Sequence, residues 1–250
     1  EEKPVVATGP DACAHHKDIR SITVPDTVLS IGFSCFRDCP RLERVVLPAY
    51  VTDFSSSWFS QCNRLEYLVL PGMLEKIKPS LFDIPHLRSV VIGIRTEAVE
   101  PGAFAKSKLE SVQVHPDNPY LMTDGYALYR QDGSQLVAMV VPVGSYEMLP
   151  TCTVVAKKGF SNFECIKQIG ISQSLEALGP FALSRTGISE FVAPSSLSFI
   201  GEKAFFKCEK LTSIRINEGV TTVCDHAFSD TKITSLRLPS SVTQLGNPLA

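Results

Sequence analysis

Cysteine and histidine are the residues of this chain with the chemistry for metal binding or nucleophilic catalysis. Cys13, His15 and His16 stand close together and could bind a metal ion weakly, although they lie in a segment that is expected to be flexible. No Cys-x-x-Cys pair occurs anywhere in the sequence, so a structural zinc site is not expected. We therefore predict no metal ligands and no cofactor.

Catalysis finds equally little support in the spacing of the titratable residues. A nucleophile needs a base within hydrogen-bond reach and a pocket that excludes water. His86, His115 and His226 fall at unrelated positions of the repeat described below, and the carboxylates are similarly scattered. We predict no catalytic residues and a protein that is not an enzyme.

The elements that hold these side chains are defined by an internal repeat. Most steps between the residues that open each copy are 22 or 23 residues long, and these opening residues are Ile19, Leu42, Leu65, Leu87, Leu109, Ile166, Ile188, Leu211 and Ile233. With the opening residue at offset 0, apolar residues recur at offsets 3, 5 and 12. Offset 17 holds Phe36, Phe59, Phe82, Phe104, Leu183, Phe205 and Phe228. A period of this kind is typical of a solenoid.

Each copy predicts the same local structure. Offsets 0 to 5 suit a short strand that a following proline ends, as at Pro48 and Pro194, because proline lacks the N–H that a sheet needs. A second short extended segment surrounds offset 12, and the stretch from Ala204 to Leu211 predicts one or two helical turns. Stacked copies would form a parallel sheet and a continuous row of phenylalanines. The predicted fold is an α/β repeat solenoid.

One irregularity predicts an insertion. The opening residue after Leu109 is Ile166, 57 residues later, and a degenerate copy restarts at Val143. Two Asp-Gly pairs, at residues 124–125 and 132–133, are flanked by apolar residues and predict a hairpin at about 115–145. Residues 1–18 match no repeat position and are predicted to be an N-terminal tether, followed by the solenoid over residues 19–250.

The repeat also carries a family resemblance. The copy that contains Ile188, Phe191, Pro194, Ile200, Phe205 and Cys208 resembles the BspA-like class of leucine-rich repeat. The resemblance covers nearly all of the chain from Ile19 to Leu245. It implies a right-handed, curved leucine-rich-repeat superhelix with a parallel sheet on one face. It also implies a surface-exposed or secreted protein of a host-associated microbe, which an N-terminal lipid could anchor through the tether.

Three of the eight cysteines share one position of the repeat. Cys39, Cys62 and Cys208 each stand three residues before an opening residue, which favours small buried side chains. Cys39 and Cys62 occupy neighbouring copies, and a spacing of about 5 Å between stacked strands would also allow a disulfide. Free buried thiols and a Cys39–Cys62 bond are both compatible with the sequence.

Composition and charge argue against nucleic-acid binding and against a membrane-spanning helix. The formal net charge is −2 and no basic stripe is present, so we expect no nucleic acid. No run of 18 apolar residues could form a membrane-spanning helix.

The strand pattern predicts two candidate binding spots on the sheet face. Offsets 2 and 4 should point away from the core, which places Arg44, Val46, Tyr67, Val69 and Val91 together as a partly apolar strip. The alternative is that valine is present only for its β-propensity. The second spot is basic and holds Arg215 and Arg237; its alternative is an ordinary solvated face.

These observations predict an extracellular or cell-surface interaction or adhesion module. Its sheet face, and in second place the hairpin, would bind a macromolecular partner, either a protein or a glycan, such as host extracellular matrix. We expect a monomer. The alternative is a passive spacer or a self-assembling surface-layer protein.

Overall fold

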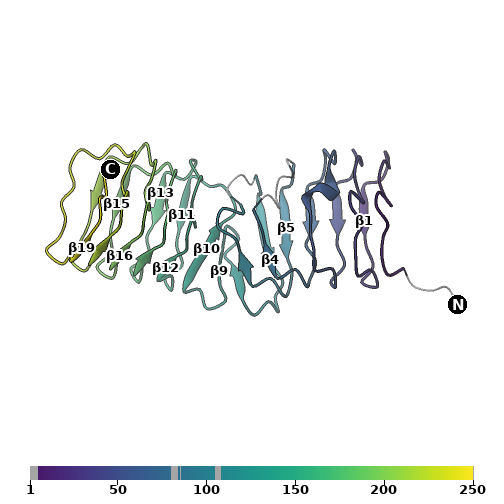
Figure 1. The fold of residues 1–250 in the computed structure, drawn as a ribbon, viewed down its shortest axis with the longest axis horizontal. Coiled ribbons are helices and arrows are strands. Elements are labelled where there is room, and N and C mark those ends of the chain that lie inside the picture. The colour runs from purple at the N-terminus through teal and green to yellow at the C-terminus, as the bar shows by residue number, and fades with distance from the viewer. Residues whose placement is uncertain (1–4, 80–83, 85, 105–107, 250) are drawn as a thin grey trace. The chain divides into compact units, whose positions relative to one another are not determined.

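The computed structural model describes residues 5–79, 84, 86–104 and 108–249. The chain divides into two compact units, an N-terminal unit of residues Glu1–Tyr126 and a C-terminal unit of residues Ala127–Ala250 (Figure 1). Each unit is a stack of coils whose strands are short and parallel, apart from one antiparallel hairpin. Within the described residues, no helix has the length and apolar character that would let it cross a membrane.

In the N-terminal unit, the first strand of each coil joins one parallel sheet. Its order is β1 (Ser21–Thr23), β2 (Arg44–Val46), β3 (Tyr67–Val69), β5 (Ser89–Ile92) and β7 (Ser111–Val114). Val45 pairs with Leu68 and Leu68 with Val90, so equivalent residues of successive coils lie side by side. The second strands of two coils, β4 (Lys76–Ile77) and β6 (Ala98–Val99), pair with each other. β8 (Leu121–Thr123) follows the last coil of the unit.

In the C-terminal unit, the second strands form the longer ladder. It runs through β12 (Val154–Val155), β14 (Ala177–Leu178), β16 (Phe199–Ile200), β18 (Thr222–Val223) and β19 (Gln244–Leu245). The first strands form two separate parallel pairs, β11 (Ser145–Glu147) with β13 (Gln168–Gly170), and β15 (Glu190–Val192) with β17 (Ser213–Arg215). The predicted restart of the repeat at Val143 is therefore confirmed, because β11 begins two residues later.

The core of each unit consists of rows of equivalent side chains. Val45, Leu68 and Val90 are fully buried, since they point inward from consecutive strands. The predicted aromatic row is present where it can be followed: Phe36 stacks on Phe59 with ring centroids 5.5 Å apart, and Phe205 lies 5.5 Å from Phe228. Of the remaining members, Phe104 is buried, whereas Phe82 lies outside the described residues.

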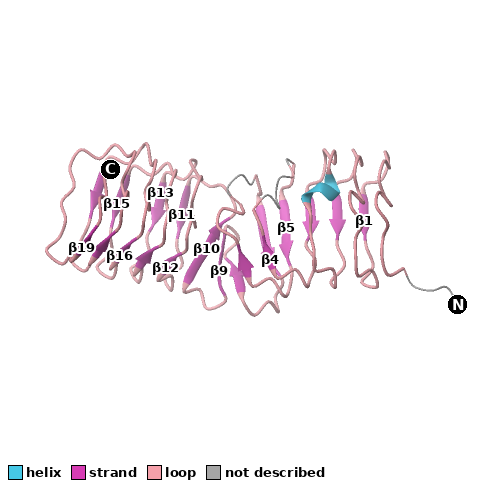
Figure 2. Cartoon of the chain, in the orientation of Figure 1, coloured by secondary structure: helices cyan, strands magenta, loops and turns pink. Residues whose placement is uncertain are grey.

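The segments around the aromatic row are turns, so the predicted helical turns are wrong. The one helix in the described part of the chain is a short 3-10 helix, η1 (Ser56–Phe59) (Figure 2). The turns contain non-glycine residues with positive φ, and in the C-terminal unit these are Lys158, Asn162, Phe181, Arg185, Lys203, Lys207, His226 and Asp230. A right-handed helix cannot include such residues. The fold is thus a β-solenoid with almost no helix, and the right-handed superhelix stays a prediction.

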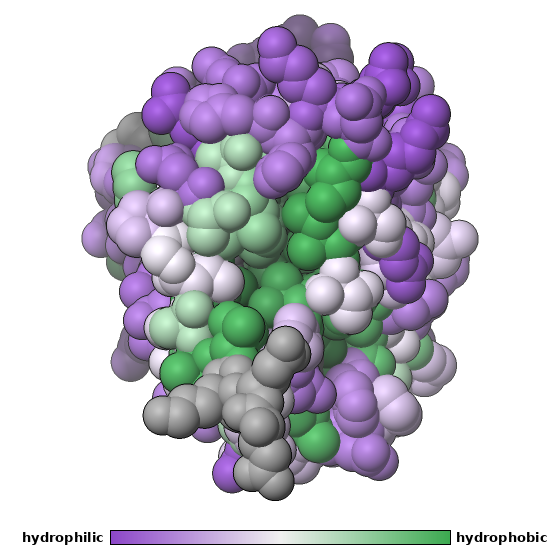
Figure 3. Space-filling view, turned by 90° about the vertical axis from the view of Figure 1, so that its right-hand side faces the viewer, coloured by the Kyte–Doolittle hydropathy of each residue, from purple (hydrophilic) through white to green (hydrophobic). Residues whose placement is uncertain are grey.

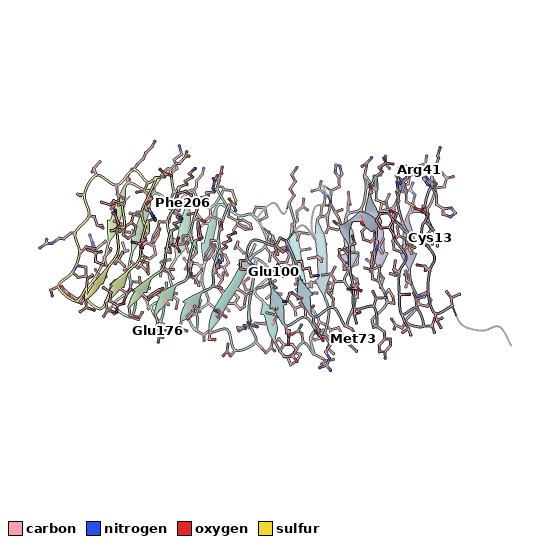
Figure 4. The ribbon with its side chains drawn as sticks, in the orientation of Figure 1. Cys13, Arg41, Met73, Glu100, Glu176 and Phe206 are labelled. Atoms are coloured by element: carbon pink, nitrogen blue, oxygen red, sulfur yellow. The ribbon has the colours of Figure 1, made fainter. Side chains whose placement is uncertain are left out.

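Backbone hydrogen bonds between coils explain why turns replace helices. The N–H groups of Phe160, Leu183 and Phe205 donate to carbonyl oxygens of the next coil at 2.8 Å. The residues directly before Leu183 and Phe205, which are Ala182 and Ala204, instead donate to carbonyls three residues back in their own coil. An α-helix would direct all of these N–H groups within one coil and leave the stacking side unpaired. Figure 4 shows Phe206 on the turn side of the C-terminal unit, opposite Glu176, which directly precedes β14.

The N-terminal segment differs from the predicted tether. Ala7 forms a parallel bridge with Ser30, and the Cys13 N–H donates to the Cys35 carbonyl at 2.9 Å. Cys13 stands 23 residues before Phe36 and therefore occupies the position of the aromatic row. Residues 7–15 are part of a coil, and only this spacing, without an aromatic residue, signals it in the sequence.

Apolar side chains are exposed at the end of the N-terminal unit where β1 lies. β1 is the terminal strand of its sheet, and Val5, Val6 and Leu29 are each more than half exposed. Viewed onto this end, apolar surface gathers at the middle with polar surface around it (Figure 3).

The predicted hairpin is present. β9 (Ala127–Arg130) pairs antiparallel with β10 (Gln135–Met139), with Gly133 at positive φ in the turn, and β10 then pairs in parallel with β12. Asn118 ends the preceding coil. Its buried amide donates to the carbonyls of Gly93 and Thr96 and accepts hydrogen bonds from the backbone of Tyr120 and Leu121.

Cys39, Cys62 and Cys208 are free and buried, as the prediction of buried thiols requires. Each thiol donates to a backbone carbonyl of the preceding coil: the distances are 3.2 Å from Cys39 to Cys13, 3.0 Å from Cys62 to Phe36, and 3.0 Å from Cys208 to Leu183. Desolvation by burial raises the pKa of Cys62 to about 11.

Close approach of the coils predicts the effect of a single methyl group. A Cβ at Gly201 would lie 2.7 Å from the backbone oxygen of Leu178, so Gly201→Ala should lower the free energy of unfolding by about 1–3 kcal/mol. Gly144→Ala is the matched control, because nothing lies within 4 Å of its Cβ. Urea unfolding of both variants measures the difference. Equal stability of the two variants would show that the coils do not approach this closely.

The buried thiol of Cys62 predicts a pH dependence at alkaline pH. Its folded pKa, about 11, lies above the ordinary value of 9.0, so the stabilisation by the neutral thiol is complete below pH 9 and is lost as the pH rises toward 11. Over this range wild type should lose about 2–3 kcal/mol relative to Cys62→Ala. Chemical unfolding at several pH values tests this, with Cys165→Ala, which removes an exposed thiol, as control. Parallel pH profiles of wild type and Cys62→Ala would contradict the burial of this thiol.

Candidate functional site

The strip predicted on the N-terminal unit is contiguous in the structure. Val46 pairs with Val69 and Val69 with Val91, while Arg44 pairs with Tyr67 in the neighbouring column. The two columns are separated by the buried row of Val45, Leu68 and Val90. All five predicted residues lie on the outer face: Arg44 is exposed and the other four are half-buried. We call Arg44, Val46, Tyr67, Val69 and Val91 the valine strip.

A contact that the sequence analysis missed orders one side of the valine strip. The guanidinium carbon of Arg44 lies 3.8 Å from the centre of the Tyr67 ring, within the range of a cation–π interaction. The direct parallel pairing of the two residues brings them together. The sequence signal was available, because Arg44 and Tyr67 stand 23 residues apart at the same offset.

Ion pairs border the valine strip at the start of the strands. Arg20 contacts Glu43 at 2.9 Å, and Arg88 contacts both Glu66 and Glu110. These residues occupy offset 1 of successive coils, and all five side chains are substantially exposed. Exposed pairs of this kind contribute about 0.2–1 kcal/mol each at most, so their main effect is to make one rim of the strip polar.

The second predicted spot lies in the C-terminal unit and is built differently. Arg215 is in β17, where it pairs with Val192 of β15. Arg237 stands at the equivalent offset of the next coil, but its segment forms no strand and does not pair with β17. A groove of about 780 Å³ lies between the two segments, and both arginines line it.

No arrangement for catalysis or metal binding emerges among the described residues. Nowhere in residues 5–79, 84, 86–104 and 108–249 do three or more histidine, cysteine or acidic side chains form a metal site. His15 is paired with Asp38 at 2.9 Å, and His115 lies close to Asp117. The pKa shifts with a resolved cause belong chiefly to cysteines, whose pKa is raised by burial.

The repeat itself identifies the family. The family described as "BspA type Leucine rich repeat region" matches residues 8–127 and 142–249 in six copies. The chain belongs to the BspA-type leucine-rich repeat family. The unmatched stretch between the two ranges contains nearly all of the β9–β10 hairpin, and the first range begins within the coil to which residues 7–15 belong.

Solved structures of bacterial leucine-rich repeat proteins are similar to this chain. A leucine-rich repeat protein from Eubacterium ventriosum is 20% identical, with a TM-score of 0.58 over 98% of this chain and 80% of that one. Another from Bacteroides ovatus is also 20% identical, with a TM-score of 0.49 over 97% and 78%. A leucine rich cell surface protein from Faecalibacterium prausnitzii is 16% identical, with a TM-score of 0.46 over 94% and 84%. The first likeness supports the fold, and no curated protein matches the sequence.

The Arg44–Tyr67 contact predicts a measurable coupling. A double-mutant cycle of Arg44→Ala and Tyr67→Ala should give a coupling free energy of about 0.5–1 kcal/mol, because the pair is partly exposed. Thermal or urea unfolding of wild type, both single variants and the double variant provides the four values. Strictly additive losses would mean that the guanidinium does not stack on the ring in solution.

Proposed function

We propose that this chain is a non-enzymatic interaction module that binds a macromolecular partner through the valine strip. The observation that carries the proposal is that Val46, Val69 and Val91 lie in register on the outer face, beside Tyr67 and only half-buried. Three valines in one outward column, next to an aromatic side chain, give an apolar contact surface with a polar rim. Tyrosine and arginine are the side chains that most often dominate binding energy at protein interfaces.

The strip favours a protein partner over a small ligand. It is an open sheet surface several strands wide, and small-molecule sites are concave and enclosed. A flat face with an arginine, a tyrosine and apolar neighbours suits a protein or a glycan of the host extracellular matrix. The β9–β10 hairpin is proposed as a second contact.

We also propose that the chain acts in the extracellular space or at the cell surface. Membership of the BspA-type family supports this location. An N-terminal lipid would hold the protein on the membrane, and metabolic acyl labelling of intact cells tests the anchor. Absence of label from the mature protein would contradict a lipid anchor without affecting the binding role of the strip.

A spacer or self-assembling surface protein is the second candidate. The exposed apolar side chains of Val5, Val6 and Leu29 favour it. Size-exclusion chromatography across a hundredfold concentration range, from about 1 to about 100 μM, distinguishes the two functions. Assembly would shift the elution with concentration, whereas a monomeric binding module would elute at one position.

The valine strip is tested by pull-down from a solubilised extracellular-matrix extract, followed by affinity measurement with the retained component. Tyr67→Ala or Val69→Glu should weaken binding at least about tenfold, because each removes apolar contact from the centre of the strip. Gln113→Glu is the control, since Gln113 lies at the far end of the same column. Circular dichroism checks that each variant is folded. Unchanged affinity in both strip variants would remove this face as the binding site.

A further inference from the structure

One edge of strand β17 is open. Its other edge pairs with β15, and the Ala193 N–H donates to the Arg215 carbonyl at 2.9 Å. If the next coil paired with β17 in the same way, the Ile216 N–H would donate to the carbonyl oxygen of Arg237. Among the described residues, no hydrogen bond joins residues 213–216 to residues 234–238. β17 therefore presents unpaired backbone groups, as an edge strand does.

The groove beside this edge is lined by two segments of the chain. β17 and Asn217 form one wall, and Arg237, Leu238 and Pro239 form the other. Glu218 connects the two segments, because its carboxylate accepts hydrogen bonds from the backbone of Ser240 and Ser241. The volume of about 780 Å³ falls within the usual range of binding sites, about 300–1,000 Å³.

The lining of the groove combines polar groups with apolar side chains and two arginines. Ile214 and Leu238 are half-buried, whereas Phe191, the equivalent of Ile214 in the preceding coil, is 3% exposed. Arg215 and Arg237 are both exposed, and neither belongs to an ion pair within the described residues. Glu218 also lines the groove; its carboxylate accepts hydrogen bonds from Ser240 and Ser241, and no ion pair joins it to either arginine within the described residues.

We propose that this groove binds an extended peptide segment of another protein, which adds as a strand to the open edge of β17. Addition of a strand to an exposed sheet edge is a recurring mode of peptide recognition, in which main-chain hydrogen bonds give affinity and side-chain pockets give specificity. The proposal rests on the proposed function only in taking the chain as an interaction module. It concerns a different unit and names the chemistry of the ligand.

The geometry also specifies the side chains of the peptide. Successive residues of a strand point to opposite faces. The peptide residue in register with Arg215 points outward, toward the two guanidinium groups, and should be glutamate or aspartate. Its two neighbours point inward to Ile214 and Leu238 and should be apolar. The recognised sequence is therefore apolar, acidic, apolar, with the carboxylate bound by arginine as a charge-assisted pair.

The probe is a fluorescently labelled pentapeptide, Thr-Val-Glu-Val-Thr, with both termini blocked. Fluorescence anisotropy with wild-type protein should show binding. The same peptide with glutamine in place of glutamate should bind about five- to tenfold more weakly, because it loses the interaction with the arginines. A version with every backbone nitrogen methylated should bind more weakly still, since it cannot pair with β17. Equal affinity of the glutamate and glutamine peptides, unimpaired binding of the methylated peptide, or no binding of the glutamate peptide would overturn the proposal.

Protein variants assign the binding to the groove. Arg215→Gln and Arg237→Gln should each reduce affinity for the glutamate peptide and leave affinity for the glutamine peptide unchanged. Lys157→Gln is the matched control, because it removes one exposed positive charge of the same unit outside the groove. Affinity that falls equally in all three variants would indicate nonspecific attraction and contradict the site. Tyr67→Ala should leave peptide binding unchanged, so failure of the valine strip and failure of the groove are distinguishable.

Discussion

The structure depends on backbone hydrogen bonds that connect each coil to the next at a fixed step of 22 or 23 residues. These bonds form in the strands and also in the turns, where Phe160, Leu183 and Phe205 each donate to the following coil. Because the step is constant, a side chain type chosen at one offset recurs at the same place in the stack. The buried rows, the Phe36–Phe59 stack and the valine strip are all consequences of this single register.

The same constraint accounts for the interruptions. Where a coil cannot continue the pairing, a polar side chain forms hydrogen bonds with the backbone groups, as the Asn118 amide does with the carbonyls of Gly93 and Thr96 before the hairpin. Where the described residues provide no such hydrogen bond, the backbone groups of a strand edge stay unpaired, as on the side of β17 away from β15. Sites for partners are thus expected in two kinds of place: on faces where the register repeats a side chain, and at breaks where the register stops.

Much of the fold follows from sequence because the repeat fixes which residues are neighbours. The pairing of Arg44 with Tyr67 and of Val46 with Val69 needs only the offset of each residue. The helical turns could not be judged in this way. Ala204-Phe205 and its equivalents have the composition of a short helix, yet the hydrogen bonds that decide the conformation come from another coil, and residues such as Lys203 and Lys207 adopt positive φ to permit them. The coil at residues 7–15 was missed because Cys13 replaces the aromatic residue that marks the row. The groove at Arg215 could not be predicted either. It exists because residues 234–238 do not pair with β17, although their sequence matches the repeat.

The most direct measurement is the detection, by solution NMR, of scalar couplings across the hydrogen bonds of the turns. Stacked coils predict couplings from the nitrogens of Phe160, Leu183 and Phe205 to the carbonyl carbons of Ala182, Ala204 and Ala227, one coil further along the chain. Couplings from these nitrogens to carbonyls four residues back in the same coil would instead demonstrate helical turns, and would contradict the in-register stacking of the C-terminal unit, in which the groove lies.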